Sequence, residues 1–147
     1  MKNKSDLVGY YYTKIVKSIR YLEFTFSRVN NLSTNPELLT DEQLELWDSF
    51  AVRFARTSDL FLSKFLKAAA KRDDPAFDGT FRDTLNYCEK LKIIENVPKW
   101  LEIRELRNVT VHEYSDQDLN EIFKKLVKFT PELIDLSAFL HSFLEEK

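Results

Sequence analysis

The feature that most constrains the fold is an apolar repeat near the start of the chain, with alternating steps of four and three residues. Its members are Val8, Tyr12, Ile15, Ile19, Leu22, Phe26 and Val29. This spacing puts all of them on one face of an α-helix and predicts a first helix over about residues 6–30. A second apolar line, Tyr10, Tyr21 and Phe24, lies on another face among Lys14, Lys17 and Arg28. A helix with two apolar lines is either central in its bundle or partly buried by another chain.

Capping residues mark further helix starts along the chain. These starts are Thr40 with Gln43, Thr80 with Asp83, Pro98, Ser115 with Asp118, and Thr130-Pro131, where one helix stops and the next begins. A long apolar seam follows the first of them: Leu44, Trp47, Ala51, Phe54, Ser58, Phe61, Phe65 and Ala69. Only two glycines occur in 147 residues, which argues against tight hairpins and a glycine-rich phosphate-binding loop. The sequence predicts an all-α fold, a single up-and-down bundle of five to six helices in one domain over residues 1–147.

Composition narrows the class of protein. No apolar run reaches the length of a signal peptide or of the ~18 residues of a membrane span, so we expect a cytoplasmic protein without a membrane partner. Cys88 is the only cysteine, which excludes an internal disulfide, and its apolar neighbours predict a small buried thiol. With two histidines and no cysteine cluster, we expect no metal site and no cofactor. A formal charge of −2 argues against a generally basic nucleic-acid binder, so RNA contact would need locally gathered charge.

The segment RELRNVTVHEY, from Arg104 to Tyr114, gathers the most chemically capable side chains. On three turns of a predicted helix, Arg104, Asn108 and His112 form one column, and Arg107 lies about 140° from His112. A straight helix would not aim both at one point. Either His112 lies where the helix ends, or a second copy of the same helix completes the site about a two-fold axis.

This set of side chains suits cleavage of an RNA phosphodiester. His112 can take the proton from a 2′-hydroxyl or protonate the leaving oxygen near neutral pH, and Arg107 can stabilise the charge that grows on the phosphate. Asn108 can orient the imidazole, and Tyr114 offers a phenol beside the same site. The competing interpretation of His112 is a structural histidine at a helix end, where the helix dipole favours a cation. His141, with no arginine five to seven positions before it, is expected to be structural or exposed.

A basic stripe is predicted on the second long helix, opposite its apolar seam. It consists of Arg53, Arg56, Lys64, Lys67 and Lys71, which fall within roughly 80° of one another at ~100° per residue. Such a stripe is either a solvated helix face or a groove for RNA phosphates or an acidic partner.

The longer pattern R-N-x-x-x-H-x-Y, formed by Arg107, Asn108, His112 and Tyr114, resembles the R-x4-H-x-Y signature of the HepT branch of the HEPN family. The order around it is also similar, with a helix ending YCEKLKII, a short proline-bearing link, then WLEIRELRNVTVHEY and a further helix. The likeness is strong from about residue 81 to 126 and extends weakly to RTSDL at residues 56–60.

The resemblance implies a metal-independent ribonuclease toxin of a toxin–antitoxin system. Such proteins act as two-fold homodimers in which Arg107 and His112 of both copies would line a cleft, supported by Arg104 and Asn108. The implied antitoxin is a minimal nucleotidyltransferase of the MntA type, which in some systems adds AMP to the tyrosine that Tyr114 matches. An added AMP would inhibit by bulk and like-charge repulsion of RNA phosphate.

Two other functions stay open on the sequence. One is a non-catalytic partner subunit of a nucleotidyltransferase, in which Arg104, Arg107 and His112 bind a nucleotide or another anion without cleaving it. The other is a helical assembly protein that dimerises through Tyr21 and Phe24 on its first helix.

Overall fold

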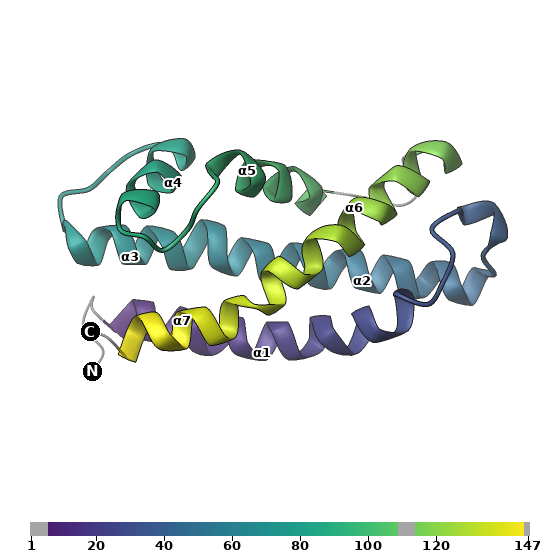
Figure 1. Ribbon diagram of the computed structural model, residues 1–147, viewed down its shortest axis with the longest axis horizontal. Helices are drawn as coiled ribbons and strands as arrows, with labels where there is room; N and C mark the ends of the chain where they lie inside the picture. Colours follow the sequence, from purple (N-terminus) through teal and green to yellow (C-terminus); the bar gives the residue numbers. More distant parts are fainter. Residues whose placement is uncertain (1–5, 109–113, 146–147) are drawn as a thin grey trace.

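The structure is a computed structural model that describes residues 6–108 and 114–145, and every regular element in those ranges is a helix (Figure 1). The helices are α1 (Asp6–Val29), η1 (Pro36–Leu38), α2 (Asp41–Asp59), η2 (Leu60–Phe65), α3 (Leu66–Asp73), α4 (Phe81–Lys90), α5 (Val97–Glu105), η3 (Leu106–Asn108), α6 (Asp116–Ile134) and α7 (Leu136–Glu145). The predicted all-α class is confirmed for this part of the chain.

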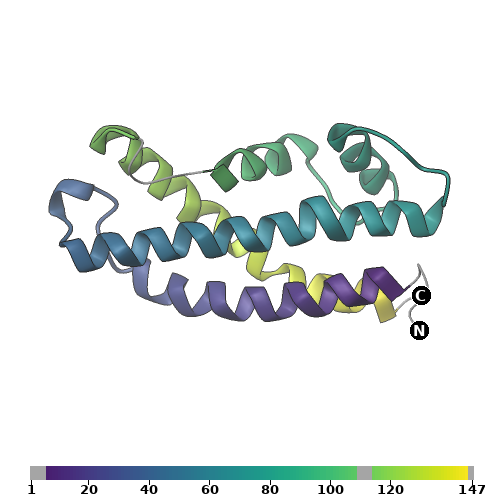
Figure 2. The same ribbon diagram turned by 180° about the vertical axis from the view of Figure 1, so that it is seen from behind.

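Two long rods form the base of the molecule. The first rod is α1. The second rod consists of α2, η2 and α3, which follow one another without a break and lie antiparallel beside α1 (Figures 1 and 2). A buried hydrogen bond between the Ser18 and Thr57 hydroxyls, 2.6 Å long, joins the rods near their middle. Helices α4 and α5 lie along the α2–α3 rod, α6 crosses it, and α7 runs beside α1 (Figure 1).

The predicted caps form because they need only neighbouring residues. Thr40 with Gln43 and Thr80 with Asp83 make complete capping boxes, and the Ser115 side chain accepts a hydrogen bond from the backbone N–H of Asp118. Each cap satisfies backbone donors that the first helical turn leaves without partners.

The second rod contains one π-helical turn, η2, which the sequence did not predict. From Thr57 onward its buried residues recur every four positions, at Thr57, Phe61, Phe65 and Ala69. An α-helix repeats every 3.6 residues, so this spacing would rotate the apolar line away from the core. The wider π turn, closed by a hydrogen bond from the N–H of Leu66 to the carbonyl of Phe61, keeps the line facing inward.

One apolar cluster contains the buried residues of the two rods and of α4 to α7. At its centre the fully buried rings of Trp47 in α2 and Phe123 in α6 stack with centroids 4.2 Å apart and planes inclined by 4°. This contact fixes α6 across the rods, close to the segment that carries the candidate site.

The predicted helix break at Thr130-Pro131 is wrong, because α6 continues through Pro131 to Ile134. Proline removes a single backbone hydrogen bond from a helix interior. The completely buried Thr130 and Leu133 hold this turn in the core, and the Thr130 hydroxyl donates to the carbonyl of Leu126 at 2.6 Å. Across the described ranges, every helix is too short or too polar to cross a bilayer.

Candidate functional site

Helix α5 presents the first part of the candidate site and is anchored at its start. Asn96 adopts a left-handed conformation with φ 60°, and its side chain accepts a hydrogen bond from the N–H of Lys99 at 3.2 Å. Pro98 lies in the first turn, as predicted. The ring of the buried Trp100 packs 5.1 Å from that of Phe61 in η2. The helix is therefore held firmly against the second rod.

The α-helix ends at Glu105, earlier than predicted, and continues as the 3-10 turn η3 through Asn108. Tyr114 lies in a bend just before α6, so the prediction of three α-helical turns from Arg104 to Tyr114 is wrong at both of these points. The sequence after Leu106 holds an asparagine and several β-branched residues, all weak helix formers. The 140° offset between Arg107 and His112 assumed a continuous α-helix and no longer applies.

His112 belongs to residues 109–113, which lie outside the described part of the chain. Asn108 is described only in its backbone, as the last residue of η3. The predicted roles, Asn108 orienting His112 or binding phosphate and His112 acting with Arg107 on one phosphate, therefore stay predictions.

Arg107 lies at the junction of η3 and α2. Its Nη1 donates to Oδ1 of Asp59 at 3.1 Å, and the two side chains are 30% and 48% exposed. Asp59 ends α2 and is the residue that the sequence interpretation missed, although it falls within the RTSDL segment. A guanidinium carries five N–H donors, and the Asp59 contact is the one hydrogen bond that Arg107 makes among the described residues, so most donors stay available to an oxyanion.

Arg104 is directed to a different neighbour. Its guanidinium lies 3.8 Å from the ring centroid of Phe81, the first residue of α4, and its Nε is buried without a hydrogen-bond partner among the described residues. The structure thus turns Arg104 towards α4 and Arg107 towards α2. Tyr114 is 39% exposed.

The predicted basic stripe divides into two parts. Arg56, Lys64, Lys67 and Lys71 are exposed and make no ion pair within the described ranges, whereas Arg53 is half-buried. Its Nη1 donates to the Tyr21 carbonyl at 3.1 Å and to the Thr25 hydroxyl, which ties it to α1. The π turn also changes the angle between the residues before and after it, since the ~100° step holds only for α-helix.

Among the described residues, three titratable groups have a pKa that departs from its ordinary value. Burial raises the pKa of the Cys88 thiol to about 12, and its Sγ donates to the carbonyl of Leu66 at 3.4 Å, so the predicted buried thiol is confirmed. A hydrogen bond to Asp73 raises the pKa of Tyr87 to about 12. Hydrogen bonds from the Thr80 backbone and hydroxyl lower the pKa of Asp83. All three shifts follow from capping or packing, and none belongs to a described residue of the RELRNVTVHEY segment.

The other predicted or possible binding groups give simpler results. His141 is exposed on α7, as expected, with Nε2 3.6 Å from Oε1 of Glu145. No three His, Cys, Asp or Glu side chains gather as metal ligands in the described residues.

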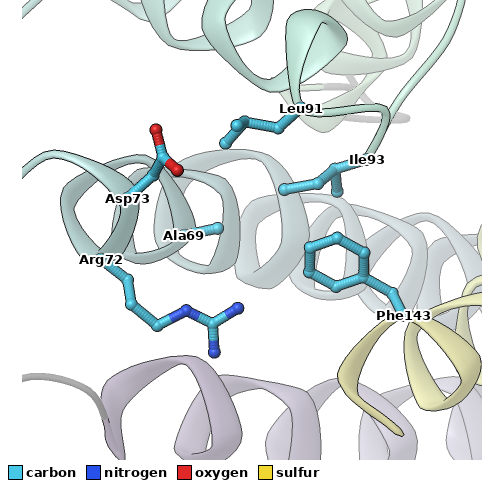
Figure 3. Close-up of a pocket in the computed structure, with 6 residues that line it drawn as sticks. All are labelled: Ala69, Arg72, Asp73, Leu91, Ile93 and Phe143. Carbon is cyan, nitrogen blue, oxygen red and sulfur yellow. The ribbon is translucent and has the colours of Figure 1, made fainter. Parts of the chain in front are cut away.

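Neither of two hollows in the described part of the chain is lined by a predicted site residue. A cavity of about 200 Å³ is lined by Ala69, Arg72, Asp73, Leu91, Ile93 and Phe143 (Figure 3). A shallower groove of about 390 Å³ lies beside the start of α5, where Lys99 and Glu132 form an ion pair.

Comparison of the chain with known protein families, with curated proteins and with solved structures finds no match.

Proposed function

We propose that this protein is a metal-independent endoribonuclease toxin with a HEPN-like fold that acts as a two-fold homodimer. The observation that carries the proposal is the setting of Arg107. The motif arginine is half-exposed at the η3–α2 junction, and Asp59 fixes its orientation while leaving donors free for phosphate. The likeness of RELRNVTVHEY to the HepT signature and the all-helical fold support the same function.

In the proposed reaction the 2′-oxygen of a ribose attacks the adjacent phosphorus, and the bond to the 5′-oxygen breaks. His112 takes the proton of the 2′-hydroxyl or supplies one to the leaving 5′-oxygen, and the partner's equivalent group serves the other step. Arg107 stabilises the negative charge that develops on the phosphate oxygens. The products are a 2′,3′-cyclic phosphate and a 5′-hydroxyl.

The proposed antitoxin is an MntA-type nucleotidyltransferase that transfers AMP to Tyr114. Exposure of 39% at Tyr114, in the bend before α6, leaves its side chain accessible to another protein. An adenylyl group would add bulk and negative charge to the segment that carries the motif and hinder approach of RNA.

The test is RNA cleavage by the purified protein in the presence of a chelator. We expect wild type to cut RNA and His112→Ala to lose at least about a hundredfold in rate, since general acid–base catalysis contributes about 10²- to 10⁴-fold. His141→Ala removes the chain's other, exposed histidine and serves as the matched control, with the wild-type rate. With the antitoxin and ATP added, wild type should gain one adenylyl group and stop cutting, whereas Tyr114→Phe should gain none. Equal rates for wild type and His112→Ala would refute the catalytic role.

The alternative is a non-catalytic subunit that binds a nucleotide for a partner nucleotidyltransferase. The internal contacts of Arg104 with Phe81 and of Arg107 with Asp59 favour it, because both cations are already held in place. In that case nucleotide would bind the intact chain, with Arg107→Ala weakening the binding, and RNA would survive incubation.

A further inference from the structure

Helix α1 carries an unbalanced positive charge on its outer side. From Leu7 to Leu22 it contains Lys14, Lys17 and Arg20 and no acidic residue. The next acid, Glu23, points about 100° away from Phe24 around the helix. Cations at this surface are therefore not neutralised from within that stretch of the helix.

Two exposed aromatic rings lie among these cations. Tyr21 is 43% exposed and Phe24 is 57% exposed. The Arg28 guanidinium lies 4.5 Å from the Phe24 centroid, and the guanidinium of Arg20 lies 5.9 Å from that of Tyr21. Exposed rings beside arginines form a surface that is both apolar and cationic.

Arg53 connects this part of α1 to the second rod. It donates to the Tyr21 carbonyl, its guanidinium lies 5.6 Å from the Tyr21 centroid, and Arg56 follows it one turn later on α2. We call the combined surface the basic aromatic face, defined by Lys14, Lys17, Arg20, Tyr21, Phe24, Arg28, Arg53 and Arg56. Figure 2 shows the backbone of α1 and α2 in front, with α6 and α7 behind them.

A second copy of the chain is a poor occupant for this face. A two-fold interface brings the same patch of both copies together, so lysines and arginines would meet lysines and arginines. Like charges placed together across an interface repel each other and disfavour association. An anionic partner instead gains from every one of these cations.

We propose that the basic aromatic face binds single-stranded RNA. Backbone phosphates would lie along Lys14, Lys17, Arg53 and Arg56, and unpaired bases would stack on Tyr21 and Phe24. A single strand fits better than a duplex, because only unpaired bases expose their faces to aromatic rings.

This inference rests on the proposed function for the role of the bound strand, as substrate leading towards Arg107. Arg56 lies three residues before Asp59 on α2, and Asp59 holds Arg107. Neighbouring positions of one helix face thus connect the basic aromatic face to the candidate site. Binding itself needs no cleavage, so the two proposals fail separately.

The test is fluorescence anisotropy of a labelled oligouridylate titrated with the full-length His112→Ala protein, in which cleavage is not expected. Phe24→Ala should weaken binding by about five- to a hundredfold, the range of one base–aromatic stack. Phe139→Ala, which removes an exposed phenylalanine of α7, is its matched control and should leave the Kd unchanged.

Charge is tested in the same way. Lys14→Ala with Lys17→Ala should weaken binding and reduce the slope of log Kd against log salt by about 1.4, the value for two phosphates on a single strand. Lys124→Ala with Lys128→Ala changes the net charge equally on exposed positions of α6 and should leave the slope unchanged.

The proposal is overturned if each variant binds no more weakly than its control. It is also overturned if polyglutamate competes as well as RNA and Phe24→Ala has no effect, which would assign the face to an acidic protein. If the variants lose RNA binding as expected but the wild-type protein cuts no RNA, this inference is supported and the proposed ribonuclease activity is refuted.

Discussion

At the scale of single residues, the contact between Arg107 and Asp59 gives the candidate site its geometry. The two residues are 48 positions apart, so neither periodicity nor motif spacing can pair them. Arg107 itself was predictable, because its chemistry and its place in RELRNVTVHEY are local. Asp59 was not, since its role depends on how α5 and η3 pack against α2.

We predict that Asp59→Asn lowers RNA cleavage without a comparable loss of stability. The pair is partly exposed, and exposed ion pairs stabilise proteins by about 0–1 kcal/mol. Release of the guanidinium, however, misplaces a group that stabilises the transition state, and such errors cost about a hundredfold in rate. If Asp59 positions Arg107, kcat should fall more than KM rises.

The matched control is Glu102→Gln, which breaks the exposed pair of Glu102 with Lys125 on α6. It should keep the wild-type rate and change the free energy of unfolding by a similar small amount. A loss of stability in Asp59→Asn that accounts for its whole loss of rate would contradict the positioning role.

At the scale of elements, the helix starts that have a capping box followed from the sequence, whereas the predicted restart at Thr130-Pro131 and the irregular turns did not. The Thr40 and Thr80 capping boxes depend on residues three apart, so their sequence signal is sufficient. The end of α5 at Glu105 and the passage of α6 through Pro131 depend instead on packing against other elements. The π turn η2 also depends on packing, although the four-residue spacing of the apolar residues after Thr57 is a sequence signal for it.

The π turn leads to a prediction about deletions. A π turn holds one residue more than the α-helix that would join the same two ends. Removing the half-exposed Ser63 should therefore convert η2 to α-helix while the buried faces of α2 and α3 stay in register. We expect the free energy of unfolding, from urea denaturation followed by circular dichroism, to change by about 1 kcal/mol or less.

Deletion of Ala55, also half-exposed but in the regular part of α2, is the comparison. It would rotate everything after it by about 100° and carry buried Phe61 and Phe65 away from the core. That variant should not fold. If both deletions lower the free energy of unfolding equally, η2 does not arise from one extra residue in the helix.

At the scale of the whole molecule, the two rods present two surfaces of different character. The basic aromatic face is spread over α1 and the adjoining edge of α2. The other surface lies on α2 around Val52 and Asp59, which are two turns apart, and Asp59 meets Arg107 there. Val52 is 55% exposed, an apolar side chain at the edge of the candidate site.

A dimer that pairs two copies of the site would cover this second surface. Standard interfaces bury about 800 Å² per partner, enough for η3 and the part of α2 around Val52 and Asp59 but not for α1 as well. The proposed homodimer therefore leaves α1 open to RNA, and Val52 becomes a central contact near the two-fold axis. Wild type should have twice the mass of one chain in sedimentation or light scattering.

We predict that Val52→Asp yields a monomer that no longer cuts RNA but still binds oligouridylate. A buried carboxylate facing its own copy across the axis is unpaired and repelled, and unpaired buried charges cost several kcal/mol. Leu38→Asp places the same charge on a leucine of η1 that is 72% exposed, and it should stay dimeric and active. Loss of dimer, cleavage and RNA binding together would place the RNA at the interface and not on α1. If the Val52→Asp protein remains an active dimer, the two-fold axis does not lie at α2. If the wild-type protein is monomeric, the proposed homodimer is refuted.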